Sequence, residues 1–357
     1  MSRVEEIFKQ IVQIDSISSE EKQISDYMCQ FFEKLKVSFE QDQHNNIIVF
    51  ISGKGNKETL LLNAHIDTVE PGRGIIPFTD NEGFIRSKEN TILGADNKTA
   101  VSALMRLIET ISQEKEYTGH SLEIVFTTSE ESGNYGAHGL DYSQLKSQRG
   151  YCSDASNRAF GDIIIASPFY NRFDIVFEGK SAHASQSARA INVTKSVGSF
   201  LSKIETGQIN EKTIANIGVV KMGDVVNTVP GKAIISGEVR SYLESNLTQV
   251  TNKIIQLAEE STYDKVKVKS AVVRENGGFE IEKKDPFVLK TLKVVHNYNK
   301  TPKFIKSWGC YDANVFSEHG IQLINIADGS IDSHTSQERI HSKNLDNLVN
   351  MFYDLVS

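Results

Sequence analysis

Seven side chains of the kinds that bind divalent metal ions or transfer protons lie beside short apolar runs of the sequence. They are His65, Asp67, Asp96, Glu130, Glu131, Asp154 and His334. Most follow an apolar run closely, as Glu130 and Glu131 follow LEIVFTT (122–128). If these runs are strands of an open α/β sheet, their carboxyl ends lie at the edge where such sheets bind ligands. The pattern therefore predicts that the seven side chains converge on one site.

The residue types at this predicted site indicate metal-dependent hydrolysis. Imidazole and carboxylate ligands suit zinc and related divalent ions, and a site without cysteine is typical of catalytic zinc. The sequence has no HExxH motif, which excludes the zinc peptidases built on that motif. Adjacent Glu130 and Glu131 point in different directions, so one carboxylate can bind metal while its neighbour accepts a proton from water. If the two glutamates are considered without the other residues, a turn exposed to solvent is the alternative to a catalytic role.

Motifs along the whole chain resemble those of the di-zinc peptidases and deacylases. This family includes peptidase T, glutamate carboxypeptidases, aminoacylases and succinyl-diaminopimelate desuccinylase. GADNKTAVSAL (94–104) and SDAS (153–156) are most similar to the peptidase T branch. The other motifs are NAHIDTV (63–69), TTSEESG (127–133), SAHAS (181–185), NTVPG (227–231), DAN (312–314) and HT (334–335).

The resemblance implies two Zn²⁺ ions per subunit, in a site type that Co²⁺ or Mn²⁺ can also fill. The implied ligands are His65 and Asp154 for one ion, Glu131 and His334 for the other, and Asp96 as the bridge. Glu130 would act as the general base, with a metal-bridging hydroxide as the nucleophile. Asp67 would orient the imidazole of His65 and fix its tautomer.

Three residues in the middle of the chain also receive roles from the resemblance. His183 would stabilise the tetrahedral intermediate, often across a dimer, Arg240 would bind the substrate carboxylate, and Asn227 would contact the substrate backbone. Each has a structural alternative: a histidine at a strand edge, an arginine paired with Glu238, and an asparagine favoured in the turn before Pro-Gly. All three roles require their domain to close over the metal site.

The apolar periodicity predicts an α/β fold with two domains. Residues 1–167 and 279–357 would form a discontinuous di-zinc catalytic domain, with helices flanking a mostly parallel sheet. Residues 168–278 follow a β-α-β-β-α-β order, which predicts an inserted, ferredoxin-like α+β lid and dimerisation domain. Ser18 and Glu21 have the spacing of a capping box for a second helix.

Composition restricts the classes of binding partner and the cellular compartment that we expect for this protein. The 357 residues carry a net charge of −7 without a basic block, which argues against nucleic acid or a membrane surface as the partner. No run approaches the about 20 apolar residues of a membrane span, and the N-terminus lacks the apolar core of a signal peptide. Cys29, Cys152 and Cys310 are scattered, which disfavours disulfides and predicts a cytoplasmic protein.

We therefore expect a peptidase T-like aminopeptidase that cleaves amide bonds of small peptides and forms a homodimer through its lid domain. One alternative is an N-acyl-amino-acid deacylase or a glutamate carboxypeptidase-like enzyme, whose substrates would be acylated amino acids or peptide carboxyl ends. A second is a metal-binding scaffold on an inactive enzyme fold.

Overall fold

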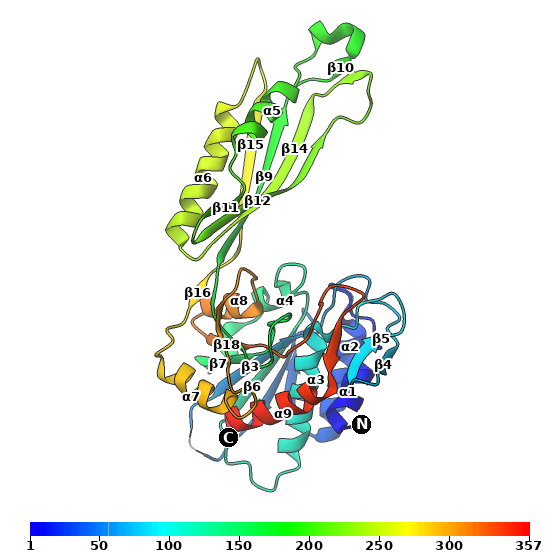
Figure 1. Cartoon of the computed structure of the whole chain (residues 1–357), viewed down its shortest axis with the longest axis vertical. Coiled ribbons are helices and arrows are strands. Elements are labelled where there is room, and N and C mark those ends of the chain that lie inside the picture. The colour runs from blue at the N-terminus through cyan, green and yellow to red at the C-terminus, as the bar shows by residue number, and fades with distance from the viewer. Residues whose placement is uncertain (56) are drawn as a thin grey trace. The chain divides into compact units, whose positions relative to one another are not determined.

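The chain forms two compact units in this computed structural model, which describes residues 1–55 and 57–357 (Figure 1). The first unit comprises Met1–Ala166, Ile281–Ser307 and Tyr311–Ser357, and the second comprises Ser167–Glu280 and Trp308–Cys310. We had placed Trp308–Cys310 in the first domain. These residues group with the second unit because Arg240 donates to the Trp308 carbonyl and Ser167 donates to the Gly309 carbonyl.

A mixed, mostly parallel sheet forms the centre of the first unit. Its strands follow the order β1-β2-β6-β3-β7-β18-β8, with β17 beside β8. The central strands β6, β3, β7 and β18 are mutually parallel, and the β1–β2, β2–β6 and β18–β8 pairs are antiparallel. The bounds are β1 (Ser38–Gln41), β2 (Ile47–Ile51), β3 (Leu60–His65), β6 (Leu122–Thr127), β7 (Arg149–Cys152), β8 (Ile163–Ser167), β17 (Phe304–Lys306) and β18 (Gln322–Ile326).

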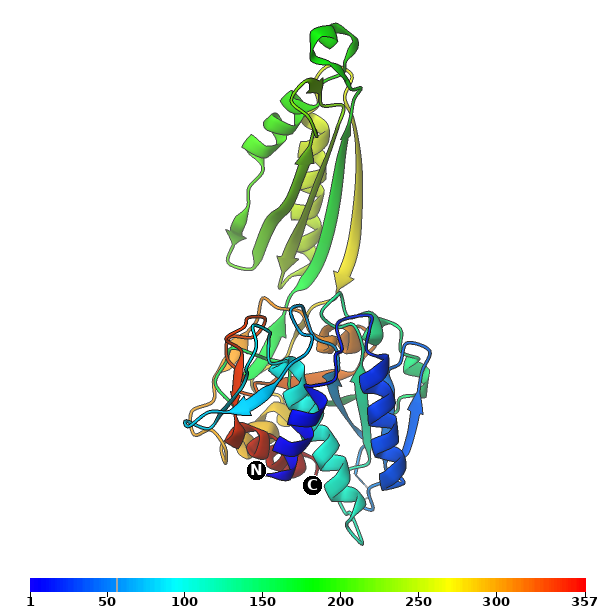
Figure 2. The same cartoon turned by 90° about the vertical axis from the view of Figure 1, so that its right-hand side faces the viewer.

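Helices pack on this sheet through the apolar faces that the sequence predicts. In α3 (Ala95–Ser112), for example, Leu104 and Leu107 are completely buried. Figure 2 shows α1 (Arg3–Ile11) beside α3, and α9 (Ser342–Val356) packs against both. The remaining helices are α2 (Lys22–Leu35), α4 (Tyr135–His138), α7 (Pro286–Val295) and α8 (Asp312–Glu318). No helix in the described ranges has the length and apolar character that a membrane crossing needs.

The capping box predicted for α2 is wrong. Glu21 occupies the N-cap position, but no side chain caps the helix there. The Ser18 hydroxyl instead donates to Asp67 at 2.7 Å. The Glu21 carboxylate accepts the backbone N–H of Ser19 and both the N–H and the hydroxyl of Ser129. Both side chains therefore form hydrogen bonds outside the first turn of the helix.

A small three-stranded sheet, which we did not predict, accompanies the central one. Its strands β4 (Pro77–Thr79), β5 (Phe84–Ser87) and β19 (Arg339–His341) pair antiparallel in the order β19-β5-β4. Each has only three or four residues, which is too short for a readable alternation of apolar and polar side chains.

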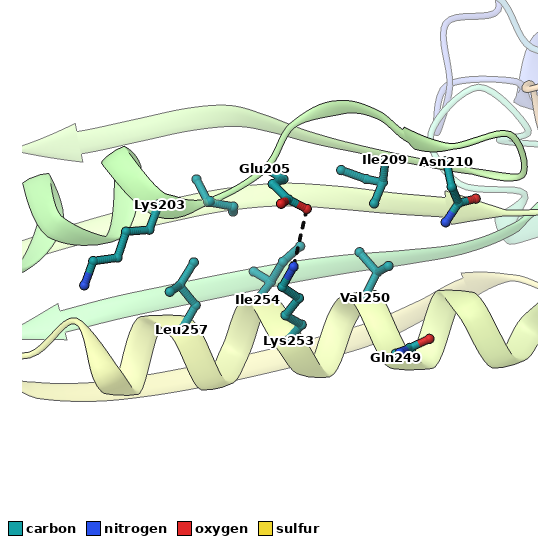
Figure 3. A pocket seen from close by; sticks show the side chains of 10 residues that line it. Lys203, Glu205, Ile209, Asn210, Gln249, Val250, Lys253, Ile254 and Leu257 are labelled. Carbon is teal, nitrogen blue, oxygen red and sulfur yellow. Dashed lines mark hydrogen bonds and ion pairs between the residues drawn. The ribbon is translucent and has the colours of Figure 1, made fainter.

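The second unit contains the predicted β-α-β-β-α-β order, with an additional short strand, β11, that we did not predict. Its antiparallel sheet runs β11-β12-β14-β9-β15, and α5 and α6 contribute Phe200 and Ile254 to a core with Phe173 and Phe177 of the sheet. A groove between α6 and β11 is lined by Ile209, Val250 and other apolar side chains (Figure 3). The bounds are β9 (Phe169–Glu178), α5 (Thr194–Lys203), β11 (Gly207–Asn210), β12 (Thr213–Met222), β14 (Lys232–Ser241), α6 (Glu244–Glu260) and β15 (Lys267–Asn276).

Candidate metal centre

The carboxyl ends of the central parallel strands deliver the predicted ligands to one edge of the sheet. His65 is the last residue of β3, and Glu130 and Glu131 follow the end of β6 by a few residues. Asp154 follows β7, and His334 lies in the segment after β18. Since these strands are parallel, their carboxyl ends lie side by side. Asp96, the fifth residue expected to bind metal, lies at the start of α3 beside His65 and His334, so the structure brings all five together.

Asp96 lies between two groups of candidate ligand atoms. On one side, His65 Nε2 is 3.4 Å from Asp96 Oδ1 and 3.6 Å from Asp154 Oδ1. On the other side, His334 Nε2 is 2.8 Å from Glu131 Oε1 and 3.6 Å from Asp96 Oδ2. Within each group, all ligand atoms lie within 4.8 Å of one another. Each oxygen of Asp96 therefore faces a different group, as a carboxylate shared by two cations would.

The imidazole of His65 provides a test of whether a cation fits. Its Nδ1 lies 3.2 Å from Asp67 Oδ1, an arrangement that places the ring proton on Nδ1. Its Nε2 is buried and makes no hydrogen bond to any residue that the structure describes. The lone pair of Nε2 then faces the carboxylates of Asp96 and Asp154, which is unfavourable unless a positive charge lies between them. The donor set fits a divalent ion.

Burial and mutual repulsion shift the titration of this cluster. Burial, reinforced by the charge of Asp154, raises the pKa of Glu130 well above its usual range. Burial also raises the pKa values of Asp154 and Glu131. Hydrogen bonds to Asp96 and Glu131 raise the pKa of His334 to about 10. So many buried carboxylates need compensating positive charge, which cations can supply.

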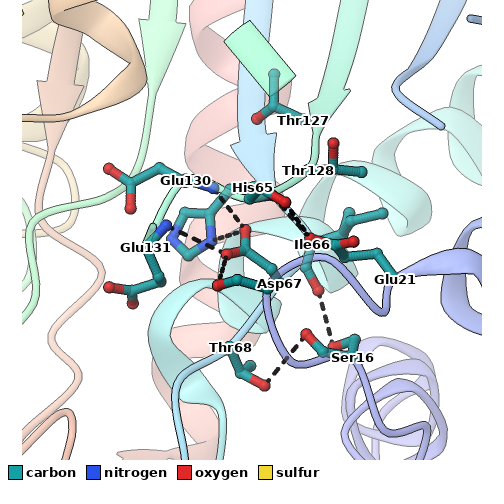
Figure 4. Close-up of polar contacts among 12 residues, drawn as sticks. Ser16, Glu21, His65, Ile66, Asp67, Thr68, Thr127, Thr128, Glu130 and Glu131 are labelled. Atoms are coloured by element: carbon teal, nitrogen blue, oxygen red, sulfur yellow. Dashed lines mark hydrogen bonds and ion pairs between the residues drawn. The ribbon is translucent and has the colours of Figure 1, made fainter. Parts of the chain in front are cut away.

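Asp67 connects His65 with the turn that carries Glu130 and Glu131, as Figure 4 shows. Its side chain is completely buried. Besides its contact with His65, Oδ1 accepts the backbone N–H of Glu130 at 3.0 Å, and Oδ2 accepts that of Glu131 at 3.2 Å. Asp67 therefore fixes the turn that carries the two glutamates as well as the orientation of His65. We had predicted a contact with His65 alone.

Two further buried residues, Glu338 and Asn134, form hydrogen bonds that position residues of the site. The sequence analysis did not predict either of them. Glu338 accepts the backbone N–H groups of Leu93 and Gly94 at 2.7 Å each and that of Asp96 at 3.0 Å. Asn134 donates to Glu130 Oε1 at 3.0 Å and to the buried Asp312 at 2.9 Å. Asp312 belongs to the quoted DAN motif, but the sequences around Glu338 and Asn134 resemble ordinary polar turns.

His183 and Asn227 lie close together in the second unit. His183 belongs to β10 (Ala182–His183), which pairs with β13 (Thr228–Val229), and the Asn227 carbonyl accepts the N–H of Ala184. The His183 ring is exposed, with Nδ1 2.8 Å from the Ser185 hydroxyl. Both residues are near the beginning of β14, which starts three residues after β13 ends.

Arg240 lies near the other end of β14. It pairs with Glu238, the structural alternative to a substrate carboxylate. Its guanidinium is 3.0 Å from the Glu238 carboxylate and donates to the Trp308 carbonyl at 2.8 Å. It also lies over the ring of Tyr170, 4.5 Å from the centroid. At about 3.3 Å per residue, the eight residue steps from Lys232 to Arg240 separate Arg240 from the end of β14 near His183 by about 26 Å.

Comparisons with known proteins agree with this architecture. Residues 61–357 match the peptidase family M20/M25/M40. An uncharacterised protein of Bacillus subtilis, YqjE, is 31% identical over 350 residues, which cover 95% of this chain and 93% of that protein. The crystal structure of the aminopeptidase PepT from Bacillus cereus has a TM-score of 0.89 at 28% identity, covering 99% of this chain and 97% of that one.

A tripeptidase structure from Staphylococcus aureus has a TM-score of 0.91 at 26% identity, with the same shares of the two chains covered. These likenesses confirm the predicted family, fold class and class of enzyme. The sequence match alone spans most of the chain. The chain therefore belongs to peptidase family M20/M25/M40 and is a metallopeptidase of that family.

Proposed function

We propose that this metallopeptidase is a peptidase T-like aminopeptidase that hydrolyses short peptides with two Zn²⁺ ions. The observation that carries the proposal is the pair of ligand groups sharing Asp96, with Glu130 beside them. Support for peptides with a free amino end comes from the two structural relatives named above, an aminopeptidase and a tripeptidase.

In this proposal each ion has three protein ligands, with Asp96 common to both. His65 and Asp154 complete one site, and Glu131 and His334 complete the other. When bound, such ions polarise the scissile carbonyl and lower the pKa of the attacking water. The protein positions the ligands and excludes bulk water, since all of them except His334 are nearly buried.

Glu130 is the carboxylate of the cluster best placed to move protons. Asp96 and Glu131 both lie against His334, whereas Glu130 accepts its one side-chain hydrogen bond among the described residues from Asn134, at Oε1. Oε2 is thus left to take a proton from the attacking water and deliver it to the leaving amine. Asp67 holds the backbone on which this carboxylate is carried.

The second unit would contribute to substrate binding. We propose that His183 stabilises the developing oxyanion, Asn227 contacts the substrate backbone, and Arg240 binds the substrate carboxylate in exchange for Glu238. Because Arg240 lies about 26 Å along β14 from the end of that strand near His183, one rigid unit cannot present both side chains to the same short peptide. His183 would therefore serve the site of a second copy in a homodimer.

A tripeptide and its N-acetylated form separate the aminopeptidase from its closest rivals. We expect hydrolysis of the free tripeptide and at least about 100-fold slower hydrolysis of the blocked one, because an aminopeptidase recognises the free amine that acetylation removes. Faster hydrolysis of the acetylated form would instead identify a deacylase or a carboxypeptidase. Product analysis by mass spectrometry shows which bond is cut.

Glu130→Gln tests the role of the base. Gln keeps the size of the side chain and an oxygen for Asn134, but it cannot accept the proton. We expect kcat to fall by about 100-fold or more, with both ions retained by elemental analysis. Glu116→Gln, at an exposed ion pair with Lys54, is the matched control. A parent protein that binds two ions but hydrolyses neither peptides nor acylated amino acids would be a scaffold.

A further inference from the structure

The turn that carries the two catalytic-site glutamates starts in an unfavourable backbone conformation. Ser129, the residue before Glu130, has φ of +51°. This left-handed region is disfavoured for residues with a Cβ atom, so surrounding contacts must hold it. The conformation determines the direction in which Glu130 and Glu131 leave strand β6. Whatever holds Ser129 therefore also positions these two carboxylates.

Glu21 is the group that holds Ser129. Its Oε1 accepts the backbone N–H of Ser129 at 2.9 Å and the Ser129 hydroxyl at 2.7 Å. The same oxygen accepts the N–H of Ser19 at 2.8 Å, and Ser19 is also left-handed, with φ of +73°. Glu21 is 4% exposed and Ser129 is 7% exposed, so water cannot readily replace these bonds.

Glu21 and Asp67 together bind three consecutive amides. Glu21 accepts the N–H of Ser129, and Asp67 accepts those of Glu130 and Glu131. Figure 4 shows the two carboxylates reaching the turn from different segments. Glu21 comes from the N-terminal segment, outside the residues 61–357 that match the family. Its carboxylate does not cap α2, so its hydrogen bonds serve the turn and Ser19 instead.

We propose that Glu21 is a positioning residue of the metal centre. It holds Ser129 left-handed so that Glu131 reaches its ligand position and Glu130 reaches the substrate. The proposal rests on the proposed function for its kinetic readout. Its zinc-binding readout does not require any substrate to be known.

The first test compares Ser129→Gly with Ser129→Ala. Both variants lose the hydroxyl that helps to hold residue 129, but glycine adopts a positive φ without the penalty that the Cβ atom of alanine imposes. We expect Ser129→Gly to retain zinc affinity and kcat within about threefold, and Ser129→Ala to lose about ten- to 100-fold in kcat, since small misplacements of catalytic groups have such effects. Equal behaviour of the two variants would contradict a positioning role for the backbone conformation.

The second test concerns the carboxylate itself. All three hydrogen bonds end on Oε1, so Glu21→Gln can keep them, whereas Glu21→Ala loses them. We expect Glu21→Ala to weaken binding of one zinc ion by about tenfold or more and to lower kcat with KM within about twofold. Glu21→Gln should stay close to the parent. Zinc affinity is measured by competition with a chromophoric chelator, and circular dichroism confirms folding.

The double variant distinguishes positioning from general stabilisation. When residue 129 is glycine, the left-handed conformation needs less support, so adding Glu21→Ala should reduce kcat and zinc affinity less than it does in the parent. A loss of the same size in both backgrounds, or parent-like zinc affinity in Glu21→Ala, would overturn the proposal. If the parent hydrolyses no peptide, the proposed function fails, and the zinc affinities still decide the role of Glu21.

Discussion

Single buried side chains determine how the carboxylates of the metal centre are held. Asn134 lies between two of them and donates one hydrogen bond to Glu130 and one to Asp312. Asp312 is itself held by the Thr127 hydroxyl. Since the amide contacts two acceptors, its nitrogen must face them. One oxygen of Glu130 is thereby anchored, and the other is left for proton transfer.

Asn134→Gly should lower kcat while leaving zinc binding intact. Asn134 has φ of +56°, so glycine fits the backbone and the variant removes only the side chain. A hydrogen bond to a charged group contributes about 1.5–3 kcal/mol, which corresponds to about a ten- to 100-fold loss in kcat. Steady-state kinetics and zinc analysis check this. Unchanged kcat would show that Glu130 needs no anchor.

Asp328 provides a prediction on stability and pH. Burial raises its pKa to about 6, and its Oδ1 accepts the N–H and the hydroxyl of Ser330. A carboxyl with a raised folded-state pKa favours folding when protonated, and this contribution is lost as the pH rises through about 6. Ionised Asp328 therefore lowers the free energy of unfolding at pH 7.

Asp328→Asn keeps an oxygen for Ser330 and removes the charge. We expect it to raise the free energy of unfolding at pH 7 by about 1–3 kcal/mol and to change it little near pH 4. Urea denaturation at both pH values measures the difference. A variant that is less stable than the parent at pH 7, or equally altered at both pH values, would contradict this interpretation.

At the scale of elements, the loop before α3 and the first turn of that helix depend on both oxygens of Glu338. Oε2 accepts two backbone N–H groups, and Oε1 accepts that of Asp96. Glutamine at this position would turn an NH₂ group toward one of these donors. Glu338→Gln should therefore displace Asp96 and weaken zinc binding by about ten- to 100-fold, unlike Glu21→Gln. If Glu338→Gln bound zinc as tightly as the parent in chelator competition, the loop would hold Asp96 without the help of Glu338.

The elements that carry the site were predictable because their local signals are strong. The apolar runs that became β3, β6 and β7 and the apolar face of α3 gave the correct fold class. The short strands β4, β5 and β19 carry too little periodicity to be seen. Ser18 and Glu21 have the spacing of a capping box, yet two of the three hydrogen bonds that Glu21 accepts come from Ser129, 108 residues away. Local patterns cannot reveal hydrogen bonds between groups so far apart, and the bonds of Glu338 to the loop before α3 and of Asn134 to Asp312 were missed for the same reason.

At the scale of the whole molecule, the proposed dimer can be tested by mixing inactive variants. Glu130→Gln should inactivate its own site, and His183→Ala should inactivate the site of the other copy. A mixed dimer then contains one site with both groups intact. We expect subunit exchange between the two variants to restore about a quarter of the parent activity, since half the dimers are mixed and each has one working site. No recovery, despite exchange shown by mass spectrometry, would place His183 outside the neighbouring site.

The most direct test of the account is a crystal structure of the zinc-loaded protein with anomalous data at the zinc edge. We predict two peaks, one bound by His65 and Asp154 and the other by Glu131 and His334, with one oxygen of Asp96 at each. A single peak, or peaks away from Asp96, would contradict the shared-carboxylate centre on which the proposed function depends.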